Sequence, residues 1–123
     1  MNLSGFEFYY GWRKMFLSHF QGKDKEVPLV VEALEGELVT QQQEISYQDF
    51  IVKQSDYEKS ALVLVEDFIK KNEINNPVID LTSILIQRNG TLAFLCYCSW
   101  AEDDGIAIVL GLKQYIVGQD DFL

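Results

Sequence analysis

The chain has 123 residues, of which 48% are hydrophobic and 13% aromatic, and this content is sufficient for a packed core. It excludes intrinsic disorder, collagen-like repeats and a scaffold that depends on disulfides. Nineteen acidic and ten basic residues give a formal net charge of -9, which argues against a surface that follows nucleic-acid phosphates. We therefore expect no nucleic-acid partner.

The first third of the chain has the pattern of β-strands. Aromatic residues stand at positions 6, 8 and 10, and this alternation predicts a strand. Two further apolar runs, at 14–20 and 27–33, flank the polar cluster 21–25, which contains the glycine that a chain reversal favours. The two runs therefore predict a hairpin.

The middle of the chain has helical spacing. Residues 41–53 contain neither glycine nor proline, and their apolar side chains recur at intervals of three and four, which predicts a helix. Ser55 and Glu58 match the Ser-x-x-Glu capping box, so a second helix is expected to begin there. A single apolar stripe follows within it, formed by Ala61, Leu62, Val65, Phe68 and Ile69.

The last third of the chain has the pattern of a sheet. Asn89 and Gly90 separate the apolar runs 84–88 and 91–98, and this pair accepts the positive φ angles of a two-residue hairpin turn. Two more strands are expected at 106–110 and 113–117, which completes a four-stranded antiparallel meander.

The fold class that these elements predict is α+β. It consists of one or more antiparallel sheets, built from the N-terminal strands and the C-terminal four-stranded meander and packed with one or two central helices. Since no linker, repeat or low-complexity tract interrupts the pattern, residues 1–123 are expected to form a single domain.

The length of the apolar runs and the spacing of the two cysteines indicate in which cellular compartment the protein is expected. No run approaches the roughly 20 residues that a membrane span requires, and the first residues lack the pattern of a signal peptide. We therefore expect a cytoplasmic protein with no membrane partner. Cys96 and Cys98 lie two apart in a predicted strand, where the extended geometry does not favour a disulfide, so both are expected to be reduced and buried.

Few residues are suited to catalysis. His19 is the only histidine, which excludes a site built from several histidines, and we expect it to be a structural residue of a strand. Two lesser alternatives are a catalytic base next to Ser18 and a zinc ligand together with the two cysteines. No catalytic residue, metal ligand or cofactor is therefore predicted.

One segment concentrates acidic residues. Glu102, Asp103 and Asp104 precede a glycine, and Asp120 and Asp121 could come close to them if the last two strands pair. Such loops can hold Ca²⁺ or Mg²⁺, although the twelve-residue calcium loop is absent, and solvated charge is the simpler interpretation. Two nearby carboxylates can also act as general acid and base, which leaves a hydrolase as an alternative.

Aromatic residues provide further candidates for contact with a partner. Trp100 stands at the end of a predicted strand, where its ring can cap the sheet and cover the helices. Tyr9 and Trp12 could form an exposed patch, although packing in the core is expected for most of the aromatic residues in this region.

The C-terminal segment 98–108, together with Val117 to Asp120, resembles an uncharacterised bacterial family classed as a domain of unknown function. Members of that family end in Cys-x-Trp, an acidic turn with glycine, an apolar strand and Val-Gly-x-x-Asp. Upstream, Gln43, Tyr47 and Phe50 are similar to a helical stretch of the same family. The resemblance implies a small α+β domain without assigned catalytic activity, and some small acidic bacterial domains of this kind resemble immunity proteins that neutralise toxins.

The function that we expect is a non-enzymatic protein-binding module for a basic protein partner, because the charge of -9 attracts positive surfaces. The candidate binding residues are Trp100, Glu102, Asp103, Asp104 and Asp120. The alternative is a small metal-dependent or carboxylate-based hydrolase that uses the loop Glu102 to Asp104 with Asp120. An accessory domain of a larger system remains a third possibility, and the sequence leaves the oligomeric state open.

Overall fold

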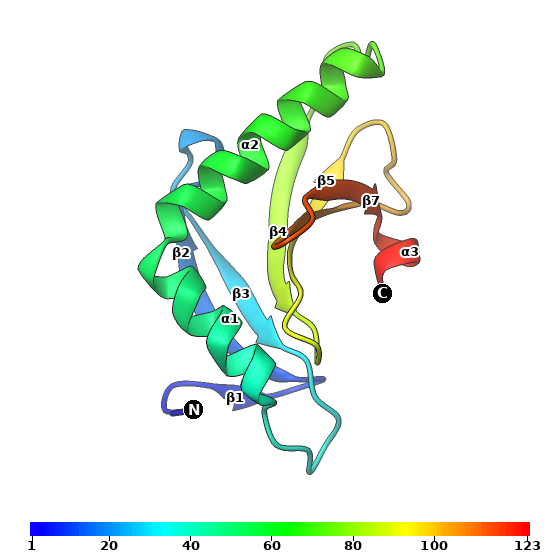
Figure 1. Cartoon of the computed structure of the whole chain (residues 1–123). Coiled ribbons are helices and arrows are strands. Elements are labelled where there is room, and N and C mark those ends of the chain that lie inside the picture. The colour runs from blue at the N-terminus through cyan, green and yellow to red at the C-terminus, as the bar shows by residue number, and fades with distance from the viewer.

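The computed structural model describes all residues from Met1 to Leu123, and Figure 1 shows one curved sheet with two long helices across one face. The strands are β1 (Glu7–Phe8), β2 (Trp12–Ser18), β3 (Lys25–Val31), β4 (Ile79–Ile86), β5 (Leu92–Cys98), β6 (Ile106–Leu110) and β7 (Tyr115–Gly118). The helices are α1 (Gln41–Val52), α2 (Gln54–Lys71) and α3 (Gln119–Phe122), and η1 (Phe20–Gly22) is a short 3₁₀ turn.

The seven strands lie side by side in the order in which they occur in the chain. All neighbours are antiparallel except β3 and β4, which pair in parallel from Leu29 opposite Ile84 to Val31 opposite Ile86. Parallel neighbours need a long crossover connection, and α1 and α2 provide it. The predicted α+β class is thus confirmed, and the N-terminal strands and the C-terminal meander join in one sheet.

The hairpin between β4 and β5 is confirmed, but its turn differs from the predicted two-residue type. The amide of Gly90 donates to the carbonyl of Gln87 (2.8 Å), and the amide of Gln87 donates to the carbonyl of Thr91 (2.8 Å). Gly90 alone takes a positive φ of 89°, as in a three-residue loop with a glycine bulge. A Cβ atom here would lie 2.8 Å from the carbonyl oxygen of Gln42 in α1, so the helix also requires glycine.

Both predicted helices are present, but the predicted capping box of α2 is wrong. The helix begins at Gln54 with Lys53 at its N-cap, so Ser55 lies within the first turn and no side chain caps the helix. The carboxylate of Glu58 turns toward the end of β2 instead and accepts from the amide of His19 (2.7 Å). A capping box occurs at the start of α1 instead. There the hydroxyl of Thr40 accepts from the amide of Gln43, whose side-chain oxygen accepts from the amide of Thr40.

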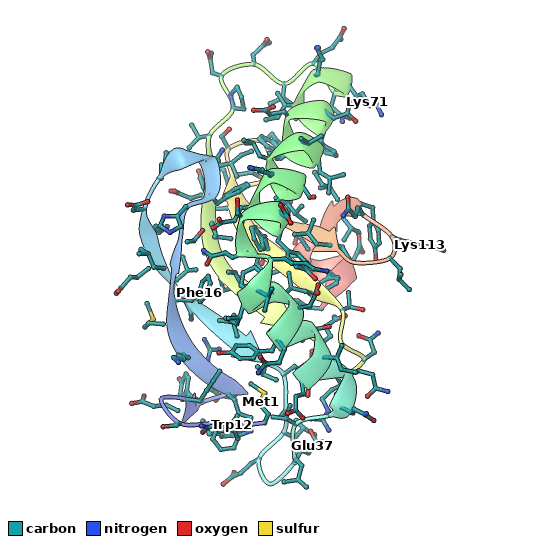
Figure 2. All side chains as sticks on the ribbon, turned by 60° about the vertical axis from the view of Figure 1, so that its left-hand side comes forward. Met1, Trp12, Phe16, Glu37, Lys71 and Lys113 are labelled. Carbon is teal, nitrogen blue, oxygen red and sulfur yellow. The ribbon has the colours of Figure 1, made fainter.

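The main core lies between the sheet and the two long helices. Phe16 of β2 and Phe50 of α1 meet there with their ring centroids 5.2 Å apart, and Figure 2 shows Phe16 between the sheet and the helices. Of the predicted stripe on α2, Ala61 and Val65 are fully buried, and Leu62 and Ile69 are partly buried against the core. Phe68, the remaining member, stacks on Trp100. Hydrophobic burial on this face is the main force that fixes the helices.

A second, smaller cluster occupies the opposite face of the sheet. It consists of Val30, Leu85, Ala93, Leu95, Ala107 and Val109. Val117 and Phe122 pack against this cluster, and the side-chain amide of Gln87 donates to the carbonyl of Phe122 (3.0 Å). The C-terminal helix α3 therefore covers part of the face that α1 and α2 leave free.

Cys96 and Cys98 are both buried and free of disulfides, as the sequence predicted. They lie on the face of β5 that the long helices cover, and burial raises the pKa of the Cys96 thiol to about 12. None of the helices combines the length and the apolar character that crossing a membrane requires.

Candidate functional site

The loop between β5 and β6 meets the junction of β7 and α3, where the amide of Gln119 donates to the carbonyl of Gly105 (3.3 Å). These two segments carry five carboxylates that we call the acidic corner: Glu102, Asp103, Asp104, Asp120 and Asp121. The side-chain amide of Gln119 donates to the carbonyls of Cys96 (3.1 Å) and Ile106 (3.3 Å). Gly105 has a φ of 71°, and a Cβ atom at this position would lie 2.6 Å from the carbonyl oxygen of Cys96. Both loops are therefore held in place by β5 and β6.

Within the acidic corner, Asp104 and Asp120 form a carboxyl pair. The sequence alone leaves open whether Asp120 comes close to the acidic loop. The hydrogen bond to Asp120 raises the pKa of Asp104, and the negative charges of Asp120, Asp121 and Asp103 raise it further. The ion pairs of the chain all involve other acidic residues. The negative charge of the acidic corner is thus not compensated by any cationic side chain of the chain.

Trp100 has a structural role beside the acidic corner. Its ring stacks on Phe68 of α2, with centroids 6.0 Å apart and an interplanar angle of 26°. It also packs against the main core while remaining partly exposed. Trp100 therefore connects the acidic corner to α2, and only the exposed part of its ring is available to a partner.

The carboxyl pair predicts a specific dependence of stability on pH. Folding raises the pKa of Asp104 above its ordinary value of 3.8. The folded state therefore favours the protonated carboxyl of Asp104. The stabilisation that this carboxyl provides is fully present below pH 3.8 and is lost as the pH rises through the pKa of the folded state. The variant Asp104→Asn should therefore melt at a higher temperature than the wild type at neutral pH and low salt.

Thermal melting of both proteins between acidic and neutral pH measures this difference. The gain of Asp104→Asn should disappear below pH 3.8, where the wild-type carboxyl is itself protonated, and should decrease in high salt because the charges are exposed. An equal or lower melting temperature of the variant at neutral pH and low salt would show that Asp104 is not repelled by its neighbours.

The other predicted candidates for chemistry do not converge on a site. His19 lies just after β2 rather than within a strand, is exposed, and has its Nδ1 atom 2.6 Å from a carboxylate oxygen of Asp24. This hydrogen bond raises the pKa of His19. No group of three or more histidine, cysteine, aspartate or glutamate side chains is arranged to hold a metal ion.

The structure also has a cleft of about 770 Å³, which the sequence did not indicate. It lies between the α1–α2 junction and the turns that follow β4 and β6. Within it the hydroxyl of Tyr57 donates to Asp49, and the ammonium of Lys53 lies 3.0 Å from the same carboxylate. The Tyr57 hydroxyl and the Lys53 ammonium lower the pKa of Asp49, while burial and Asp49 raise the pKa of Tyr57.

These shifts hold Asp49 ionised and Tyr57 protonated, so the pair serves as a fixed contact between the helices rather than as an acid and a base. The spacing of Asp49 and Lys53 is visible in the sequence as a helical i, i+4 pair. The position of Tyr57 was not predictable, because it depends on how α2 turns away from α1.

Comparison with known proteins finds no matching family model, no matching curated protein and no matching solved structure. The resemblance to a family of unknown function thus stays a prediction.

Proposed function

We propose that the chain is a non-enzymatic protein-binding module that engages a basic protein partner through the acidic corner. The observation that carries the proposal is the set of five carboxylates that form no ion pair within the chain. Among them, the hydrogen bond to Asp120 and then the repulsion by neighbouring negative charges raise the pKa of Asp104. Lysine or arginine side chains of a partner would relieve this repulsion on binding, and the net charge of -9 would accelerate the encounter.

A protein that binds nucleic acid is a chemically suitable partner, because a surface that contacts phosphates must itself be basic. An acidic module bound to such a surface would block it. Together with the resemblance to small acidic bacterial domains, this supports an immunity-like role against a basic toxin, exerted in the cytoplasm.

The experiment compares capture by two variants with the same net charge. The corner variant carries Glu102→Gln, Asp103→Asn and Asp120→Asn. The control variant carries three substitutions at exposed acidic residues elsewhere, Glu26→Gln, Glu66→Gln and Glu73→Gln. Wild type and both variants serve as bait in cell lysate of the source organism at low and high salt, and captured proteins are identified by mass spectrometry.

We expect the wild type and the control variant to retain the same basic protein at low salt and to release it at high salt. The corner variant should bind the purified partner roughly tenfold more weakly. Equal affinity for the corner and control variants would mean that total charge, rather than the acidic corner, attracts the partner. Failure to capture any basic protein would equally contradict the proposal.

The hydrolase alternative has one specific observation in its favour. Asp104 and Asp120 share a hydrogen bond, as acid and base pairs in hydrolases do. However, neither the cleft of about 770 Å³ nor the second groove, of about 630 Å³, includes a residue of the acidic corner. A rise in melting temperature with millimolar Ca²⁺, Mg²⁺ or Zn²⁺ would support the metal-dependent form of this alternative.

A further inference from the structure

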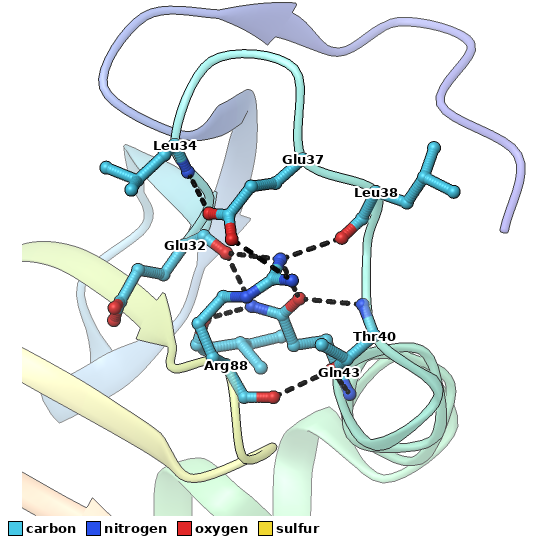
Figure 3. A network of polar contacts seen from close by, with 8 residues as sticks. Glu32, Leu34, Glu37, Leu38, Thr40, Gln43 and Arg88 are labelled. Carbon is cyan, nitrogen blue, oxygen red and sulfur yellow. Dashed lines mark hydrogen bonds and ion pairs between the residues drawn. The ribbon is translucent and has the colours of Figure 1, made fainter.

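A second exposed surface lies near the β1 edge of the sheet, whereas the acidic corner lies near the β7 edge. Four large side chains are exposed on two neighbouring segments there, and we call them together the tyrosine–leucine tip: Tyr9 (67% exposed), Tyr10 (79%), Leu34 (76%) and Leu38 (85%). The side chains of Leu34 and Leu38 point to opposite sides of their loop (Figure 3). The tyrosines belong to the turn between β1 and β2, and the leucines to the loop between β3 and α1. Both segments lie at the same end of the molecule (Figure 1).

The β1–β2 turn packs directly against the end of β3, where the second loop begins. Gly11 has a φ of 115°, and a Cβ atom there would lie 3.0 Å from the side chain of Val30 and 3.1 Å from the carbonyl oxygen of Val31. This close approach positions the tyrosines next to the start of the loop that carries the leucines.

Arg88 fixes the loop between β3 and α1 (Figure 3). Its guanidinium donates to the carbonyls of Leu38 (2.8 Å) and Glu32 (3.4 Å) and lies 3.7 Å from a carboxylate oxygen of Glu37. Glu37 in turn accepts from the amide of Leu34 (2.6 Å). The two exposed leucines are therefore presented by an ordered loop.

The turn with the tyrosines is fixed in a similar way. The Nε atom of Arg13 donates to the carbonyl of Tyr9, and its guanidinium lies 5.7 Å from the centre of the Tyr9 ring. Tyr10 adopts a φ of 53°, a left-handed conformation that glycine adopts more easily. A large aromatic side chain thus occupies a backbone position that favours glycine, and its ring lies in solvent.

The charges of the two segments that carry the tip indicate which charge a partner would have. Glu7, Glu32 and Glu35 are exposed, and none of them forms an ion pair within the chain. The two arginines of this end, Arg13 and Arg88, are already engaged in holding the loops. The segments that carry the exposed tyrosines and leucines therefore also carry negative charges that no ion pair compensates.

We propose that the tyrosine–leucine tip is a second docking surface, and that it binds a protein segment in which lysine or arginine alternates with apolar side chains. Tyrosine on a rigid loop supplies contact area at a low entropic cost, and tyrosine and arginine are frequent in the energetic centres of protein interfaces. This inference is independent of the proposed function, because no residue of the acidic corner takes part.

The test uses a phage-displayed library of random peptides selected against the full chain. We expect the enriched peptides to carry lysine or arginine beside apolar or aromatic residues. Their affinity should fall about tenfold or more for Tyr10→Gly. Because glycine adopts the φ of 53° without the steric cost of a side chain, this variant should melt at the same or a higher temperature, so lost binding would not reflect lost folding.

Two controls separate this surface from the others. Tyr115→Ser removes an exposed tyrosine of β7 (46% exposed) and should leave peptide binding unchanged. The corner variant should also keep its affinity. Peptides that bind Tyr10→Gly as tightly as the wild type, or a selection that enriches no basic peptide, would overturn the inference. If the corner variant alone loses affinity, the peptides bind at the acidic corner. This result would overturn the inference that the tip is a docking surface and would support the proposed function.

Discussion

Replacing Phe50 with alanine should lower the free energy of unfolding by about 3–5 kcal/mol, the range for emptying a large buried aromatic site. Phe50 is fully buried. Its ring centroid lies 5.2 Å from that of Phe16 in β2, 5.3 Å from that of Tyr57 in α2 and 6.2 Å from that of Phe94 in β5. One side chain thus joins both long helices to the sheet, and its removal leaves a cavity that no neighbour can fill.

Urea denaturation measures the loss for Phe50→Ala and for Phe50→Leu, which keeps most of the apolar volume and should lose less. Val52→Ala serves as the control, because Val52 lies on the same helix and is 79% exposed. A loss below about 1 kcal/mol for Phe50→Ala would mean that the space between helices and sheet collapses around the missing ring.

Replacing Gln43 with alanine should cost roughly 1–3 kcal/mol, because it leaves buried polar groups without partners. Gln43 is 0% exposed. Its amide donates to the carbonyls of Glu32 (2.7 Å) and Ile86 (3.2 Å), and its oxygen accepts from the amide of Thr40 (3.0 Å) and from Arg88 (3.3 Å). The substitution removes the side-chain half of the capping box of α1 and part of the support of the loop before it, whereas the backbone amide of residue 43 can still donate to the Thr40 hydroxyl.

Urea denaturation and amide hydrogen exchange together test this role. The loss should be accompanied by faster exchange at Glu37, whose amide donates to the carbonyl of Leu34 within the loop. Gln48→Ala is the control, because Gln48 lies on the same helix with its side chain exposed. Unchanged exchange at Glu37 would show that the loop does not depend on Gln43.

Local patterns predicted much of the fold. The helical spacing of α1, the apolar stripe of α2 and the hairpin at Gly90 depend on residues that are close in sequence, and all three are present. The parallel contact of β3 with β4 was not predictable in this way, because Leu29 and Ile84 are far apart in the chain and are connected through both long helices. The capping box was misplaced for a similar reason, since Glu58 is used by β2. Thr40 and Gln43 match Thr-x-x-Gln, another form of the capping-box pattern, so the cap of α1 could have been recognised from the sequence.

In the candidate site, too, some features depend on local sequence patterns and others on long-range packing. The pairing of β6 with β7 made proximity of Asp120 to the acidic loop conceivable from the sequence, but the specific contact of Asp104 with Asp120 is visible only in the structure. The cleft at Tyr57 depends on the angle between two helices, and the tyrosine–leucine tip depends on which aromatic residues remain outside the core. The sequence suggested exposure for Tyr9 and Trp12, and the structure exposes Tyr9 while packing Trp12 partly against the core.

The two edges of the sheet differ in how much free backbone they expose. At one edge β7 has four residues, after which the chain turns at once into α3. At the other edge β1 pairs only with Trp12 and Arg13 of β2, so residues 14–18 of β2 have no neighbouring strand on their outer side. Long free edges let sheets of different molecules join through their backbones and aggregate, and a lysine on the edge strand opposes this. Lys14 lies on this edge, and the side chain of Gln54 donates to the carbonyl of Leu17 there (2.9 Å). One edge is therefore protected against aggregation by its shortness, and the other by a charge and by a contact from α2.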